Sequence, residues 1–145
     1  MRVLFLALAT GFGSGYSPKA PGTVGSLLGV IIIYFLKSRG LDSWVILAAS
    51  IPIGTAVAHV AENYLGEHDS PKIVIDEITG MLIAGLFLPI AFLLPAFLLF
   101  RLLDIFKPGP IGSLQRLPGG LGIMADDVLA GFLVWVNLKS ISMLF

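Results

Sequence analysis

The chain has 145 residues, 57% of them hydrophobic and 12% charged, and its formal net charge is zero. Soluble domains carry about 25% charged residues, so a chain this short has more apolar side chain than one soluble core can bury. Because basic residues are not in excess, a broad nucleic-acid-binding surface is not expected. The chain has no cysteine, which excludes disulfides, thiolate metal sites and a cysteine nucleophile. We therefore expect one membrane-embedded domain over residues 1–145.

The first twelve residues combine one arginine with a short apolar run, which is also how a signal peptide begins. The glycine-rich residues that follow do not form a clear cleavage site. We therefore expect this segment to be retained as a helix that lies in the membrane interface.

Four apolar stretches then alternate with polar segments: Val24–Leu36, Trp44–Ala61, Ile78–Phe100 and Val128–Phe145. A helix that crosses the hydrocarbon core needs about 20 residues, with a range of about 17–25. The last three stretches meet this length, and the first would meet it if Gly22–Ser26 extended it. The pattern predicts an all-α fold, a polytopic bundle of membrane helices.

Pro89 and Pro95 interrupt the third apolar stretch. Proline removes a backbone donor and clashes with the preceding turn, and the residue before it avoids helical angles. We therefore expect a broken helical hairpin, with helices at Val74–Leu88 and Ala91–Phe106. One straight span would hold the charged groups at its two ends about 35 Å apart, whereas a hairpin brings them to the same membrane face.

The hairpin places three polar segments on one side of the membrane: Gly11–Thr23, Glu62–Glu77 and Arg101–Asp127. Five basic residues lie on this side and three on the other, so the positive-inside rule favours a cytoplasmic polar face. The five are Lys19, Lys72, Arg101, Lys107 and Arg116, and the three are Lys37, Arg39 and Lys139. We expect a multi-pass membrane protein with its functional site on this face.

Five carboxylates gather where the predicted helices meet the polar face: Asp76, Glu77, Asp104, Asp126 and Asp127. Helix capping would explain one residue of each adjacent pair, but it would not explain Asp104. Clustered carboxylates near lipid repel one another and become protonated unless a cation lies between them. Because oxygen ligands suit Mg²⁺, we expect all five residues to serve as metal ligands.

Arg101, Asp104 and Lys107 form one charged ridge at i, i+3 and i+6 of the second hairpin helix. One interpretation is a local salt bridge with side chains that reach the interface. The other is that Asp104 holds metal while Arg101 and Lys107 neutralise a phosphate, Arg101 through its two-pronged guanidinium. Both interpretations stay open at the level of sequence.

Residues 13–26 are rich in glycine, serine and proline and precede the first long apolar stretch. An anion at the start of that helix would meet free backbone N–H groups and the helix dipole. We expect Ser17, Lys19 and Thr23 to contribute to phosphate binding, with Thr23 also able to cap the helix. The alternative is an ordinary linker rich in turns.

Histidine occurs twice in the chain. His68 lies in the polar segment that faces the expected site, so it is a candidate acid for the leaving alcohol or else a surface residue. His59 lies within an apolar stretch, where a hydrogen bond between helices is the expected role.

Four segments, in order along nearly the whole chain, resemble the phosphatidylglycerophosphatase A family. They are residues 13–26, Ile75–Gly80 (IDEITG), Arg101–Pro108 (RLLDIFKP) and Gly120–Gly131 (GLGIMADDVLAG). The resemblance implies a Mg²⁺-dependent phosphomonoesterase that converts phosphatidylglycerophosphate, a phospholipid of the bilayer, to phosphatidylglycerol and inorganic phosphate. It also implies a location in the bacterial cytoplasmic (inner) membrane.

The expected chemistry is attack on phosphorus by a water held by Glu77 or Asp127 and activated by Mg²⁺. Arg101, Lys107 and Lys19 would stabilise the charge on the phosphoryl oxygens. The alternatives are an aspartate nucleophile, a phosphatase for another lipid phosphate such as phosphatidate, a carrier of divalent cations, and a non-catalytic subunit. Oligomeric state and the number of metal ions stay open.

Overall fold

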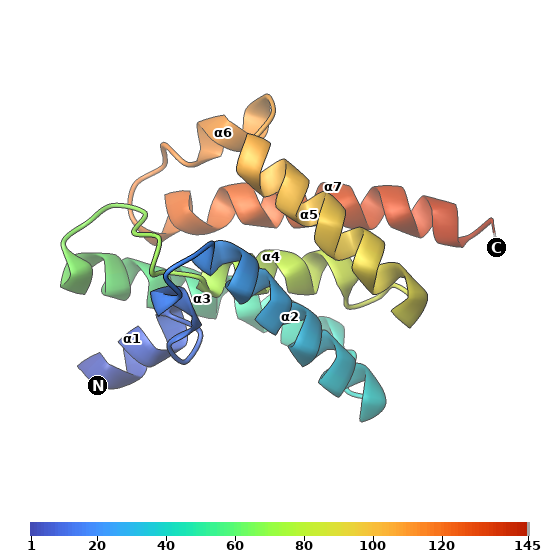
Figure 1. Ribbon diagram of the computed structural model, residues 1–145, viewed down its shortest axis with the longest axis horizontal. Coiled ribbons are helices and arrows are strands. Elements are labelled where there is room, and N and C mark those ends of the chain that lie inside the picture. Colours follow the sequence, from blue (N-terminus) through green and yellow to red (C-terminus); the bar gives the residue numbers. More distant parts are fainter. Residues whose placement is uncertain (145) are drawn as a thin grey trace.

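A computed structural model describes residues 1–144 and shows an all-helical protein (Figure 1). No β-strand occurs in this part of the chain, which confirms the predicted all-α class. In chain order the elements are α1 (Arg2–Ala9), the 3-10 turn η1 (Ser14–Tyr16), α2 (Pro21–Ser38), α3 (Trp44–Leu65), α4 (Ile75–Gly85), the 3-10 turn η2 (Ile90–Phe92), α5 (Leu93–Phe106), α6 (Pro110–Leu114) and α7 (Gly120–Ser142).

Three helices, α2, α3 and α7, are long and apolar enough to cross a membrane. Large apolar side chains are also exposed along the helices, among them Ile31 on α2, Ile53 on α3 and Leu98 on α5. A soluble monomer rarely leaves so much apolar surface uncovered, so this surface belongs in lipid. The observed helices therefore agree with the predicted helical membrane protein.

The third apolar stretch forms the predicted hairpin, because α4 and α5 are separated by Pro89 and η2. Pro95 is the third residue of α5, where a backbone N–H has no partner within the helix and its loss costs little. Both helices are shorter than predicted, since α4 ends at Gly85 and α5 begins at Leu93. At 1.5 Å per residue they measure only about 17 and 21 Å, less than the hydrocarbon thickness of about 30 Å.

Helix α4 lies at the centre of the molecule, packed against α2, α3, α5 and α7, and nearly all its residues are buried. Small residues allow this close packing. A Cβ atom on Gly80 would lie 2.8 Å from the carbonyl oxygen of Asp127 on α7, and Gly131 meets the Gly80 carbonyl oxygen in the same way. The backbones of α4 and α7 therefore touch directly beside the acidic residues.

The turn after α2, the turn between α4 and α5, and the end of α7 all lie toward the right of Figure 1. The opposite end holds the loop from α3 to α4 and the segment around α6. Contacts join the polar segments at that end: Gly22 packs against Glu77 so closely that a Cβ atom would overlap Oε1, and Gln115 donates to Asp69. The hairpin thus brings the three predicted polar segments together.

Two predicted helix starts are wrong. The last helix begins at Gly120 rather than Val128, so Asp126 and Asp127 lie inside α7 and cannot cap it. The early start depends on glycine, because a Cβ atom on Gly120 would lie 2.8 Å from the backbone nitrogen of His59. Helix α2 begins at Pro21, a residue suited to the first helical position, so Thr23 lies within its first turn and does not cap it.

Candidate active site

Three carboxylates from two helices converge at the polar end of the molecule. Asp76 and Glu77 lie in the first turn of α4, and Asp127 lies in the third turn of α7. One oxygen from each of the three side chains lies within 4.8 Å of the others. We call this group the acidic trio. It forms because the glycine contact between α4 and α7 sets the two helix backbones against each other.

The acidic trio carries buried oxygen atoms that no other group satisfies. Asp76 is 7% exposed and Asp127 is 2% exposed. Among the described residues, Asp76 Oδ1, Glu77 Oε2 and Asp127 Oδ2 have no hydrogen-bond partner. Such groups are costly unless something binds them. Three convergent carboxylate oxygens with free lone pairs fit a hard dication such as Mg²⁺.

The other two predicted ligands contact basic side chains instead. Asp104 accepts a hydrogen bond from Arg101 Nη1, and its Oδ1 lies 4.0 Å from Lys107 Nζ. Asp126 accepts a hydrogen bond from Lys107. We call Asp104 and Asp126 the paired carboxylates. The predicted salt-bridge ridge on α5 therefore exists, and through Lys107 it reaches α7.

The first turns of α2 border the site next to Arg101. Arg101 Nη1 donates to Ser26 Oγ (3.4 Å), while Ser26 Oγ donates to the Gly22 carbonyl oxygen (2.8 Å). A Cβ atom on Gly22 would lie 3.2 Å from Arg101 Nη1 and would overlap Glu77 Oε1. The free N–H groups and the positive dipole end of α2 therefore lie beside both the acidic trio and the guanidinium.

The other predicted phosphate ligands lie less centrally. Ser17 Oγ donates to the Lys19 carbonyl oxygen (2.9 Å), so its hydroxyl is used within its own turn. The side chain of Lys19 is exposed, and Thr23 is half-buried in the first turn of α2. Among the described residues, no hydrogen bond or ion pair joins any of these three to the carboxylates. Their role in phosphate binding stays a prediction.

The loop between α3 and α4 borders the site. His68 Nδ1 pairs with Glu62 at the end of α3, and donating a hydrogen bond to that carboxylate raises the pKa of His68 above its ordinary value. Asp69 Oδ2 accepts a hydrogen bond from Gln115 Nε2, which ties this loop to the segment before α7. His68 thus has an acidic partner outside the acidic trio, and its role as an acid stays a prediction.

Two residues near the site were not singled out by their sequence pattern. Ser26 is completely buried and contacts Arg101, a residue 75 positions away. Gln115 contacts Asp69, a residue 46 positions away. Ser26 lies within the glycine-rich stretch, but no local spacing signals its distant partner. Gln115 has no sequence signal that we can identify.

Known proteins resemble the chain along most of its length. The family model described as "Phosphatidylglycerophosphatase A" matches residues 7–142. A protein with that name from Escherichia coli K12 is 40% identical over 129 residues, covering 86% of this chain and 75% of the relative. Its counterpart from Haemophilus influenzae is 41% identical over 129 residues, covering 85% and 79%. A Bacteroides thetaiotaomicron protein named "Putative phosphatidylinositol-3-phosphatase" is 40% identical over 135 residues, covering 86% and 84%. No solved structure matches the chain.

Proposed function

The chain belongs to the phosphatidylglycerophosphatase A family, and on that premise we propose that it hydrolyses phosphatidylglycerophosphate to phosphatidylglycerol and inorganic phosphate. The observation that carries this proposal is the acidic trio: one oxygen from each carboxylate lies within 4.8 Å of the others, and each carboxylate has a buried oxygen without a partner among the described residues. Beside it lies the Arg101 guanidinium, whose Nε is buried and has no partner among the described residues. Such a site offers ligands for a cation and a donor for a phosphate oxygen at the same place.

Asp76, Glu77 and Asp127 would hold Mg²⁺, which fits their oxygen-only donor set and their burial. When bound, Mg²⁺ would polarise the phosphate and lower the pKa of a water molecule. The paired carboxylates would contribute differently, by fixing Arg101 and Lys107 in place. We propose three residues rather than five as direct ligands.

The side chains of this chain supply the remaining chemistry. Glu77 or Asp127 orients the attacking water and accepts its proton as the water oxygen bonds to phosphorus. The bond from phosphorus to the glycerol oxygen breaks, and that oxygen takes the proton that the carboxylate accepted from water, so the alcohol leaves neutral. Arg101 Nε and the N-terminus of α2 stabilise negative charge on the phosphoryl oxygens. The diacyl part of the substrate stays in the bilayer, so only the headgroup enters the site.

The polar end carries the donors for an anionic headgroup, and five of the eight basic residues named above lie there. This asymmetry supports a cytoplasmic orientation of the site. We propose that the protein resides in the bacterial cytoplasmic membrane, with α2, α3 and α7 as spans and the hairpin of α4 and α5 entering from the cytoplasmic side.

A second candidate substrate class comes from the Bacteroides relative. Its printed name refers to another lipid phosphate, a phosphoinositide, at the same 40% identity as the Escherichia coli relative. The acidic trio and Arg101 recognise the phosphate group that all such lipids share, and they do not distinguish the rest of the headgroup. A phosphatidate or phosphoinositide phosphatase would need the same groups.

A phosphate-release panel tests the function. The purified protein is assayed in mixed micelles with phosphatidylglycerophosphate, phosphatidate and phosphatidylinositol 3-phosphate, each with Mg²⁺ or with a chelator. We expect the highest kcat/KM with phosphatidylglycerophosphate, and no release until Mg²⁺ replaces the chelator. Preference for another lipid would reassign the substrate, and full turnover under chelation would reject the metal proposal.

A further inference from the structure

A groove runs along the outer surface between α3 and α7. It consists of three neighbouring pockets of about 700, 430 and 250 Å³. The first and second pockets share Ile51, Thr55 and Leu121, and the second and third share Ile51, Val128 and Phe132. Because each pocket continues into the next, they form one elongated depression, which we call the lateral groove.

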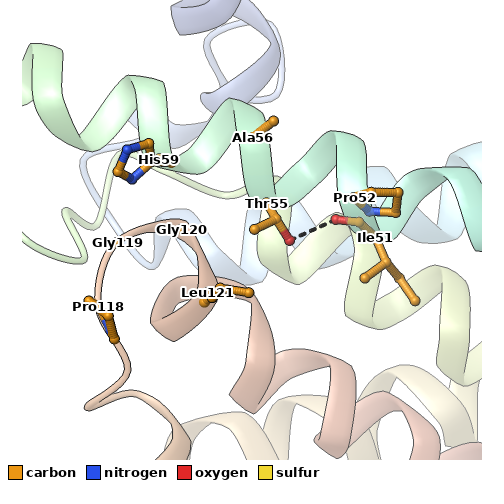
Figure 2. Close-up of a pocket in the computed structure, with 9 residues that line it drawn as sticks. All are labelled: Ile51, Pro52, Thr55, Ala56, His59, Pro118, Gly119, Gly120 and Leu121. Carbon is orange, nitrogen blue, oxygen red and sulfur yellow. Dashed lines mark hydrogen bonds between the residues drawn. The ribbon is translucent and has the colours of Figure 1, made fainter.

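The wide end of the lateral groove, its largest pocket, lies between α3 and the start of α7 (Figure 2). Figure 2 shows the His59 ring beside the Gly119–Gly120 turn, with Pro52 and Ile51 further along α3. The Thr55 hydroxyl donates to the Ile51 carbonyl oxygen (2.8 Å), so it is used within the helix. His59 has its polar neighbour Asn63 in its own helix, at 3.4 Å, and not across helices as expected. The walls are therefore almost entirely apolar.

The narrow end is lined by aromatic residues. Trp44 stacks on Phe87 with ring centroids 4.0 Å apart, and Trp135 meets Trp44 edge-on at 6.3 Å. All three residues line the third pocket. Trp44 and Trp135 are the only tryptophans in the chain, so the intrinsic fluorescence of the protein reports on this end of the groove.

The lateral groove and the acidic trio lie on different faces of α7. Leu121, Ala125, Val128 and Phe132 line the groove and recur at i, i+4, i+7 and i+11, which is one helical face. At 3.6 residues per turn, Asp127 lies about 120° around the helix from the centre of that face. A molecule bound in the groove would therefore lie apart from the phosphate group that is hydrolysed at the acidic trio.

We propose that the lateral groove binds one acyl chain of a bilayer phospholipid, at a site separate from the acidic trio. Both walls are helices long and apolar enough to span a membrane, so the groove opens into hydrocarbon. From Leu121 to Trp135 it extends about 21 Å along α7, enough for a chain that crosses one leaflet of about 15 Å.

The dimensions favour a hydrocarbon chain over a second protein helix. A helix about 10 Å wide and 21 Å long fills about 1,600 Å³, more than the roughly 1,400 Å³ of the three pockets together. An acyl chain is much thinner and flexible enough to follow three connected pockets. It also needs no hydrogen-bond partner from walls whose one hydroxyl, on Thr55, is already used.

Lipid retention tests this proposal without reference to catalysis. Ala56 is exposed on α3 and lines the wide end, whereas Ala48 is exposed on the same helix two turns away and lines none of the three pockets. Ala56→Phe fills the wide end of the groove, and Ala48→Phe is the matched control. After detergent extraction, wild type and Ala48→Phe should retain about one phospholipid per chain, and Ala56→Phe less than half as much. Equal retention in all three proteins, or none in wild type, would overturn the proposal.

Fluorescence quenching tests whether the acyl chain of a bound phospholipid lies along the lateral groove. A phospholipid with brominated acyl chains is added at a few molecules per protein in excess detergent. Tryptophan emission should fall in wild type and Ala48→Phe and stay at least twofold less quenched in Ala56→Phe. Equal quenching in both variants would overturn the proposal. A wild-type dimer that becomes a monomer in Ala56→Phe but not in Ala48→Phe would also overturn the proposal. The groove would then bind a second copy of the protein.

Discussion

The acidic trio and the paired carboxylates differ in what satisfies their charge. Within residues 1–144, each member of the acidic trio keeps a buried oxygen without a partner, while each paired carboxylate contacts Arg101 or Lys107. A buried carboxylate with a basic partner is compensated within the protein, and one without a partner needs a ligand to stay charged. The comparison supports the proposal that the adjacent residues Asp126 and Asp127 have different roles: Asp126 holds Lys107 in place, and Asp127 would bind a metal ion.

The sharpest test of this division removes one charge from the acidic trio. Asp127→Asn should lower kcat/KM by about 10²–10³-fold, because a metal site supplies several kcal/mol of transition-state stabilisation. The folded protein should be no less stable, since an unpartnered buried charge is lost. Phosphate release and thermal unfolding in detergent measure both effects. Asp42→Asn, on the turn after α2 and far from the site, should behave as wild type. Activity near wild type in Asp127→Asn would remove the proposed role of the trio.

The effect of Mg²⁺ on thermal stability should distinguish the acidic trio from the paired carboxylates. A ligand that binds only the folded state at 100 times its Kd stabilises that state by about 2.7 kcal/mol. Saturating Mg²⁺ should therefore raise the Tm of the wild type and of Asp126→Asn. It should leave the Tm of Asp76→Asn nearly unchanged, because the acidic trio has lost a ligand. Equal Mg²⁺ stabilisation in both variants would mean that the ion binds elsewhere.

Breaking the pair between Lys107 and Asp126 should affect folding more than metal binding. Asp126→Asn leaves a largely covered ammonium group without its closest carboxylate, which should cost about 1–2 kcal/mol of stability. The double variant Lys107→Met/Asp126→Asn removes both charges and should recover much of that loss. A double-mutant cycle of unfolding free energies measures the coupling. Additive effects would show that the two side chains do not depend on each other.

Much of the fold follows from local sequence rules. Pro89 and Pro95 predict the hairpin because a proline in a helix interior costs about 3 kcal/mol or more, and the hairpin in turn puts the charged segments at one end. The small residues Gly80 and Gly131 lie where helices touch, as lipid-embedded packing requires. The hairpin depends on one stretch of chain, so the sequence alone is enough to predict it.

The sequence could not be used in this way to predict which carboxylates form the acidic trio and which have basic partners. The division depends on which basic side chain reaches which acid, and Lys107 contacts Asp126 across 19 positions and two helices. The early start of α7 was also missed, because Gly120 and Gly122 lower local helix propensity. Both positions need glycine, because the His59 backbone leaves no room for a side chain on Gly120 and the nearby Leu117 carbonyl oxygen leaves none on Gly122. Both the pairing of the carboxylates and the start of α7 therefore depend on contacts between residues that are distant in the sequence.

The smallest expected effect concerns the loop that borders the site, where His68 and Glu62 form a pair near the surface. The pKa of His68 is raised by its hydrogen bond to Glu62, so the pair stabilises the fold fully below the ordinary histidine pKa of about 6.5. This stabilisation is lost as the pH rises through the raised pKa of the folded state. The Tm of wild type should therefore exceed that of Glu62→Gln slightly at about pH 6, and the difference should shrink by about pH 9. Asp42→Asn serves again as the control for general charge effects. A Tm difference that does not change with pH would mean that the pair does not depend on protonated His68, and Glu62 would then stabilise the loop by packing alone.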